Sequence, residues 1–147
     1  MKKSTALCAA ALAAVVFLAG CSARTPVAGK EFQQKAKALG YQVSAVDAGT
    51  SGGAKTYRAV KDDGDTEAVF YECSDGSAAQ ERYALLKKGI SSAGDGDAVD
   101  SSAYNKYVAQ NGEIYYTVVR MDSTVLSCKG IVADKKPVDD LVSSLKY

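Results

Sequence analysis

The four cysteines carry most of the side-chain chemistry in this sequence, because the chain contains no histidine. A thiol can be acylated, oxidised to a disulfide or used as a nucleophile, depending on its surroundings. Without histidine the chain has neither the Ser-His-Asp nor the Cys-His arrangement of nucleophilic catalysis, and it has no imidazole metal ligand. The surroundings of Cys8, Cys21, Cys73 and Cys128 therefore indicate which thiol chemistry to expect.

Cys21 ends a segment with the layout of a signal peptide. Lys2 and Lys3 give a positive start, residues 6–18 form an apolar run, and Leu18-Ala19-Gly20-Cys21 follows. The run is shorter than the roughly 20 residues that span a bilayer. Leu18–Cys21 resembles the lipobox of bacterial lipoproteins, which implies lipidation of the Cys21 thiol with fatty acyl chains such as palmitate, and cleavage just before it. An ordinary secretory peptide and an uncleaved anchor are the alternatives.

This interpretation divides the chain into a signal peptide (1–20, including Cys8), a lipidated tether (21–29) and a single domain (30–147). It places the domain outside the cytoplasm, anchored to the cell membrane, or to the outer membrane if the organism has two membranes. Cleavage removes Lys2 and Lys3, which leaves 16 basic against 17 acidic residues and a net charge of −1. A near-neutral domain lacks the excess of positive charge that is typical of proteins that bind nucleic acid.

Cys73 and Cys128 remain once Cys21 is acylated. Outside the cytoplasm an even pair is most simply a disulfide. It would close a loop of about 55 residues, and the chain-entropy description predicts a stabilisation of the folded state by about 4 kcal/mol for such a loop. Two free buried thiols or a redox couple are the alternatives, although no Cys-x-x-Cys motif is present to lower a thiolate pKa.

Apolar periodicity and turn residues predict three helices and six strands. We expect helices at 30–39, 77–88 and 136–146, and strands at 41–46, 56–61, 66–73, 104–109, 113–121 and 124–131. Ser77 and Gln80 fit a capping box, and Gly40 and Gly89 fit helix ends. The apolar stripe of the last helix is predicted to consist of Val138, Leu141, Val142 and Leu145. Residues 91–102 are rich in Gly, Asp and Ser, and they are predicted to form a mobile surface loop.

This order, α-βββ-α-βββ-α, predicts an α+β fold with antiparallel sheet and helices packed on one face. Val69–Cys73 and Thr124–Cys128 each precede a helix, which suggests an internal βββα duplication with the two cysteines at equivalent strand ends.

The domain resembles a group of small lipoproteins of Gram-positive bacteria whose function is uncharacterised. The segments that carry the resemblance are Glu31–Val43, Ala68–Glu72, Tyr107–Thr124 and Leu145–Tyr147. Ser123 departs from the Asn that is frequent in those proteins, and the cysteine pair is not general among them. The resemblance implies a fold and a location, and no activity.

Other residues of chemical interest have simpler structural explanations. Glu67, Glu72 and Glu113 could pair for acid–base catalysis, but strand alternation favours solvent-facing positions. Asp62–Asp65 and Asp95–Asp100 lack the closing Glu of an EF-hand loop, which favours solvated turns. Ser143 and Lys146 match a Ser-x-x-Lys spacing by coincidence, without the partner motifs of penicillin-binding enzymes.

The remaining candidate is a surface rich in tyrosine. Tyr104, Tyr107, Tyr115 and Tyr116 fall in one hairpin, and strand alternation sends the last two to opposite faces. The tyrosines on one face then belong to the core. Those on the other face either pair across the strands or, together with Arg120, form an exposed contact surface. For Arg120 itself we expect a neighbouring carboxylate as partner, and for Asp122 a bond to the turn backbone.

We therefore expect a monomeric, non-catalytic binding or interaction module of the cell envelope, without cofactor or metal. Its ligand would be an envelope protein or a small molecule. An accessory subunit of an envelope complex, and an envelope enzyme that uses surface carboxylates, are the alternatives.

Overall fold

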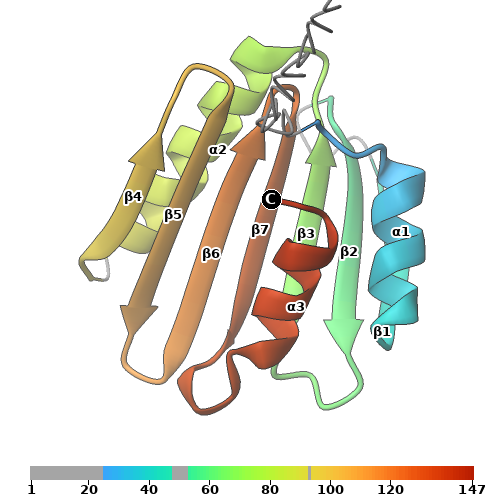
Figure 1. The fold of residues 1–147 in the computed structure, drawn as a ribbon, viewed down its shortest axis with the longest axis vertical. Coiled ribbons are helices and arrows are strands. Elements are labelled where there is room, and N and C mark those ends of the chain that lie inside the picture. Colours follow the sequence, from blue (N-terminus) through green and yellow to red (C-terminus); the bar gives the residue numbers. More distant parts are fainter. Residues whose placement is uncertain (1–24, 48–52, 93) are drawn as a thin grey trace, which may run out of the picture.

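Alternating and continuous apolar runs form the strands of one seven-stranded antiparallel sheet. The computed structural model describes residues 25–47, 53–92 and 94–147, and the elements below belong to these ranges. They are α1 (Gly29–Ala38), β1 (Tyr41–Val46), β2 (Lys55–Lys61), β3 (Glu67–Glu72), α2 (Gly76–Ser91), β4 (Gly96–Asp100), β5 (Tyr104–Asn111), β6 (Ile114–Met121), β7 (Thr124–Ile131), η2 (Val132–Asp134) and α3 (Lys136–Ser144) (Figure 1).

The α+β class and the antiparallel sheet are confirmed, but the predicted element order lacks one strand. Residues 91–102 were expected to form a loop, whereas Gly96–Asp100 is strand β4, paired with β5 at one edge of the sheet. All five residues of β4 are exposed. Because no side chain of β4 is buried, its sequence lacks the alternation by which a strand is recognised.

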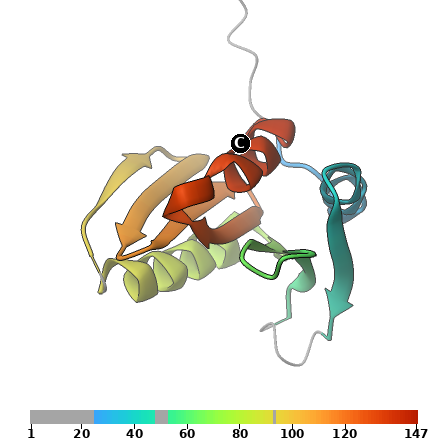
Figure 2. The same ribbon diagram turned by 90° about the horizontal axis from the view of Figure 1, so that it is seen from below.

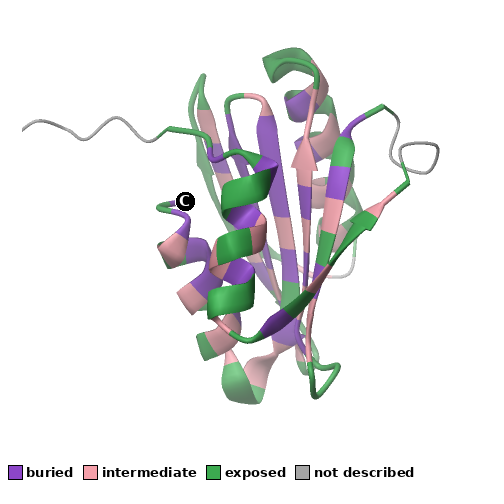
Figure 3. Ribbon diagram, turned by 90° about the vertical axis from the view of Figure 1, so that its right-hand side faces the viewer, coloured by how far each residue is buried: buried purple, intermediate pink, exposed green. Residues whose placement is uncertain are grey.

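The strand order is β1-β2-β3-β7-β6-β5-β4, with every neighbouring pair antiparallel. Helices cover both faces of this sheet, so the expectation of one covered face is wrong. Seen from below, α2 and α3 lie on opposite sides of the strands (Figure 2). The central strands are therefore buried on both faces (Figure 3). In β6, every residue from Thr117 to Met121 is buried.

The larger core, here called the front core, lies between the sheet and helices α1 and α3. Phe32 of α1 stacks on Phe70 of β3 with ring centroids 4.8 Å apart. The predicted apolar stripe of the last helix is confirmed, because its four members are fully or almost fully buried: Val138, Leu141, Val142 and Leu145. Gly40, predicted as the residue after the first helix, has φ +79° and fits that position.

The smaller core, here called the back core, lies between α2 and strands β5, β6 and β7. Ala79 and Tyr83 of α2 are buried against Tyr107, Val118 and Val125. The predicted capping box of Ser77 and Gln80 is wrong, because the N-cap is Asp75, two residues before Ser77. The Oδ1 of Asp75 accepts the backbone N–H of Ala78 at 2.9 Å. The helix continues through Gly89 to Ser91.

The suggested internal duplication does not fit this architecture. Strands β3 and β7 are antiparallel neighbours, so a two-fold axis relating two βββα units would have to run perpendicular to the sheet. Such an axis keeps both helices on the same face, whereas α2 and α3 lie on opposite faces.

The described residues begin within the segment that was predicted to be a lipidated tether (21–29). Val27 belongs to the front core, and α1 begins at Gly29. The predicted signal peptide and Cys21 lie outside the described residues. Within the described ranges, none of the helices is both long enough and apolar enough to traverse a bilayer.

Candidate functional site

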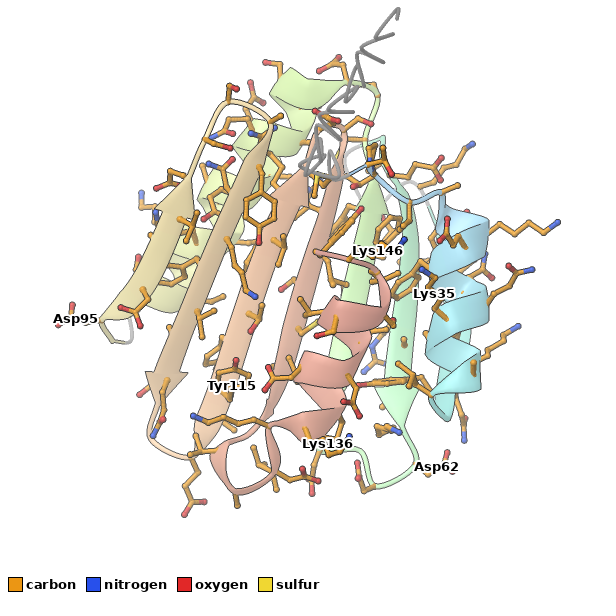
Figure 4. All side chains as sticks on the ribbon, viewed as in Figure 1. Lys35, Asp62, Asp95, Tyr115, Lys136 and Lys146 are labelled. Atoms are coloured by element: carbon orange, nitrogen blue, oxygen red, sulfur yellow. The ribbon has the colours of Figure 1, made fainter. Side chains whose placement is uncertain are left out.

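The predicted tyrosine surface is not present. Tyr107 and Tyr115 are buried, in the back and front cores respectively. Tyr104 and Tyr116 are half-buried, and they face opposite sides of the sheet. Figure 4 shows Tyr115 on the α3 side of the sheet, where its hydroxyl donates to Asp139 Oδ1 at 3.1 Å. Tyr104, Tyr107 and Tyr115 pack in or against the two cores, while Tyr116 lines a groove beside α2. The four rings therefore do not form one exposed contact surface, but the prediction that Tyr115 and Tyr116 face opposite sides of the sheet is confirmed.

Arg120 is also buried, and its expected carboxylate partner is replaced by neutral oxygens. Its Nε donates to Asn105 Oδ1 at 2.6 Å, and its Nη2 donates to the Ser102 carbonyl at 2.8 Å. Its Nη1 donates to the Asp122 carbonyl at 3.2 Å. The guanidinium therefore holds the β4–β5 turn against the β6–β7 turn, and it is not available to a ligand.

The candidate acid–base carboxylates do not converge. Glu67 and Glu72 lie on opposite faces of β3, and Glu113 lies in the turn between β5 and β6. Asp62 and Asp95 lie at separate turns (Figure 4). Across the described ranges, no cluster of three or more acidic or cysteine side chains has the geometry of a metal site.

The predicted disulfide between Cys73 and Cys128 is wrong for this structure, because both thiols are unbonded. Cys128 lies opposite Ala68 in the register, five residues before Cys73, which separates the two cysteines by about 16 Å along the strands. They also lie on opposite faces, with Cys128 in the front core and Cys73 against the back core. A disulfide requires Cα atoms within about 7 Å.

The two thiols differ in exposure. Burial raises the pKa of the Cys128 thiol to about 12, while Cys73 is half-buried and its pKa is raised chiefly by desolvation. Both shifts favour the neutral thiol over the nucleophilic thiolate.

The feature that could accept a ligand is an apolar groove between α2 and the back face of the sheet, here called the α2 groove. Its volume is about 370 Å³, within the range of small-molecule sites. The lining residues come from α2 and from strands β3, β6 and β7: Glu67, Val69, Tyr71, Leu85, Leu86, Gly89, Ile90, Tyr116, Ser127 and Lys129.

The groove exists because α2 covers only part of this face. The helix packs on β5, β6 and β7, while β3 lies beyond its edge. Val69 and Tyr71 are therefore half-buried, and Leu85 of α2 remains 67% exposed. Few large apolar side chains of the described chain are so open to solvent.

Gly89 keeps part of the groove open. A Cβ built on this residue has no atom of the surrounding structure within 4 Å. A larger side chain at position 89 would therefore extend into free space, without displacing packed atoms. Sequence reasoning assigned Gly89 to a helix end, and nothing in the sequence distinguished that role from the wall of a groove.

A network of three charged side chains borders the groove. Glu67 Oε1 lies 2.5 Å from Arg58 Nε, and Glu67 Oε2 lies 2.9 Å from Lys129 Nζ. The hydrogen bond from Arg58, with the ion pair to Lys129, holds the pKa of the Glu67 carboxyl below its usual value. Glu67 is 17% exposed, whereas both cations are about half exposed.

A second hollow lies between α2 and strands β4 and β5, and it is more polar. Its walls include Gln80, Tyr83, Lys87, Lys88 and Asn105. Lys87 is already engaged, since its Nζ lies 3.5 Å from Asp100 Oδ2 and 5.3 Å from the Tyr107 ring centroid. The α2 groove combines a more apolar lining with an exposed leucine, and we therefore regard it as the candidate site.

Comparison with known proteins supports the fold and leaves the function open. No protein-family model matches the chain, and no curated protein matches its sequence. A crystal structure of a GTP binding regulator from Thermotoga maritima is similar, with a TM-score of 0.56 and 11% sequence identity. The match covers 83% of this chain and 89% of that chain. At this identity the likeness concerns the fold alone.

Proposed function

We propose that this chain is a lipid-anchored extracytoplasmic protein whose domain binds an apolar ligand group in the α2 groove, without catalysing a reaction. The observation that carries the proposal is the groove itself. Apolar side chains of α2 and β3 face each other across a space that the fold leaves unfilled: Leu85, Leu86 and Ile90 on the helix, and Val69 and Tyr71 on the strand. Apolar walls with a small number of polar groups are typical of ligand sites.

The lipid anchor is supported by the pattern that ends at Cys21. In the folded domain, Val27 is buried and its backbone N–H donates to Tyr147. Only residues 21–26 then separate the acylated thiol from the domain, a span of at most about 20 Å. Such a tether would keep the groove close to the membrane surface, where apolar ligands partition.

Filling the groove from position 89 tests the binding proposal. The neutral fluorophore N-phenyl-1-naphthylamine should bind the full chain carrying Cys21→Ser and brighten in the groove. Gly89→Trp in this background should abolish the signal, because the indole occupies the free space. The matched control Gly89→Ala adds one methyl group and should leave fluorophore binding nearly unchanged. Equal binding by Gly89→Trp and Gly89→Ala would contradict the proposal.

The anchor has its own test. In a bacterial host supplied with labelled palmitate, the chain should incorporate label and partition into the detergent phase. Cys21→Ser should abolish both properties, while Cys73→Ser should retain them. Label on the Cys21→Ser chain would show that the acylated residue lies elsewhere.

A further inference from the structure

We propose that the α2 groove selects amphiphiles that carry an anionic head group, with a single-chain carboxylate as the simplest member of this class. The inference rests on the proposed function and adds to it the chemical class of the ligand. It follows from two features of the groove, the charges at one end and the apolar surface at the other.

The charged end has more cations than anions. Arg58 and Lys129 share the single carboxylate of Glu67, which leaves the three side chains with one net positive charge. Arg58 is 51% exposed and Lys129 is 53% exposed, so each retains N–H groups that face solvent. An incoming carboxylate could accept hydrogen bonds from these groups without displacing Glu67.

The apolar end lies further along the same face of β3. Glu67 is the first residue of β3 and Tyr71 is the fifth, which separates them by about 13 Å. Leu85, Leu86 and Ile90 line the helix side of this path. The groove is therefore polarised, with a place for a head group near Lys129 and a place for an apolar chain toward Tyr71.

Positive charge also lies beside the far end of the groove. The guanidinium carbon of Arg82 lies 4.9 Å from the Tyr71 ring centroid. A cationic amphiphile would meet the net positive charge of Arg58, Lys129 and Glu67 at the head-group end. Lys129 also borders a neighbouring hollow beside Asp65. Because a change at Lys129 alters both hollows, Arg58 and Lys129 are substituted in separate variants.

The test compares three probes with the same chain of about twelve carbons, a length close to the path along β3: dodecanoate, dodecanol and dodecyltrimethylammonium. Each probe is added to the full chain carrying Cys21→Ser with bound N-phenyl-1-naphthylamine, and displacement of the fluorophore is measured. The pH is about 8, so that dodecanoate is ionised, and each probe is kept below the concentration at which it forms micelles. Dodecanoate should displace the fluorophore at a concentration about fivefold lower than dodecanol, which is the effect expected of a partly exposed ion pair. Dodecyltrimethylammonium should be the weakest of the three.

Charge variants identify the groups responsible. Arg58→Gln and Lys129→Gln should each reduce the preference for dodecanoate over dodecanol, measured as the ratio of the two displacing concentrations in the same variant. Lys136→Gln is the matched control, because Lys136 pairs with Asp140 on α3, which packs on the opposite face. The control should retain the full preference.

Two results would overturn the inference. One is displacement by the three probes at equal concentrations, and the other is a preference that survives both Arg58→Gln and Lys129→Gln. If the fluorophore binds the parent chain and is lost in Gly89→Trp, either result refutes the head-group selectivity alone. If Gly89→Trp binds the fluorophore as well as Gly89→Ala does, the proposed function and this inference both fail.

Discussion

The hydroxyl oxygen of Tyr147 lies 2.5 Å from Thr124 Oγ1 and accepts the backbone N–H of Val27 at 3.2 Å. The last residue of the chain is thus joined to the start of β7 and to the segment that precedes α1. Tyr147 and Val27 are both buried. The contact fixes the point at which the N-terminal segment leaves the domain.

Tyr147→Phe should destabilise the domain by about 1 to 2 kcal/mol, because it leaves the buried N–H of Val27 without an acceptor. Urea denaturation measures the change, and hydrogen exchange should show faster exchange at the Val27 amide. The ring itself is retained, so packing changes little. Unchanged stability together with a protected Val27 amide would show that this contact is absent in solution.

The cysteine geometry predicts two free thiols of unequal reactivity. With Cys8→Ser and Cys21→Ser in place, a thiol reagent should titrate two groups in denaturant. In the folded chain it should react first with Cys73, since Cys128 is buried and the pKa of its thiol is raised to about 12. Cys73→Ser should remove the fast reaction. If no thiol reacts in denaturant until a reductant is added, Cys73 and Cys128 form a disulfide instead.

Two glycines should respond in opposite directions to the same substitution. A Cβ at Gly29 would overlap the Tyr57 ring and lie 2.9 Å from Glu72 Oε2, so Gly29→Ala should destabilise by about 1 to 3 kcal/mol. Gly89→Ala lies in a helix with free space around it, and it should stabilise by about 0.5 to 1 kcal/mol. Thermal or urea denaturation of both variants provides the comparison, and the same sign for both would be inconsistent with this packing.

The Glu67 ion pairs predict a defined pH dependence. The pKa of Glu67 is lowered in the folded state, so its contribution to stability is present above the unfolded value of about 4.3. That contribution is lost as the pH falls through the folded pKa. The difference in unfolding free energy between the parent chain and Glu67→Gln should therefore shrink between about pH 5 and about pH 3. A constant difference across this range would contradict the lowered pKa.

Sequence patterns predicted the elements whose burial is periodic or continuous. The bounds of β1 and β7 and the buried stripe of α3 agree with the structure. Strand β4 could not be predicted, because an edge strand without a buried side chain has no alternation. The face on which α2 packs also left no local signal, since it depends on pairing between strands distant in sequence.

The candidate site was missed for a related reason. Leu85 differs from Leu86 only in the direction it faces from α2, and Gly89 resembled a helix end. The groove forms because α2 packs on β7 and does not extend over the neighbouring strand β3. This depends on how the helix and the sheet pack together and has no local sequence pattern. The predicted tyrosine cluster is divided by the same packing, because Tyr104, Tyr107 and Tyr115 pack in or against the two cores, whereas Tyr116 lines the groove.

An NMR titration tests the central claim, that the α2 groove is a binding site, most directly. Dodecanoate added to the isotope-labelled full chain carrying Cys21→Ser should shift the amide signals of residues from both walls of the groove, including Val69, Leu86 and Gly89. Signals from α1 and α3, on the opposite face, should stay in place. Shifts confined to the front face, or no shifts at concentrations below micelle formation, would contradict the claim.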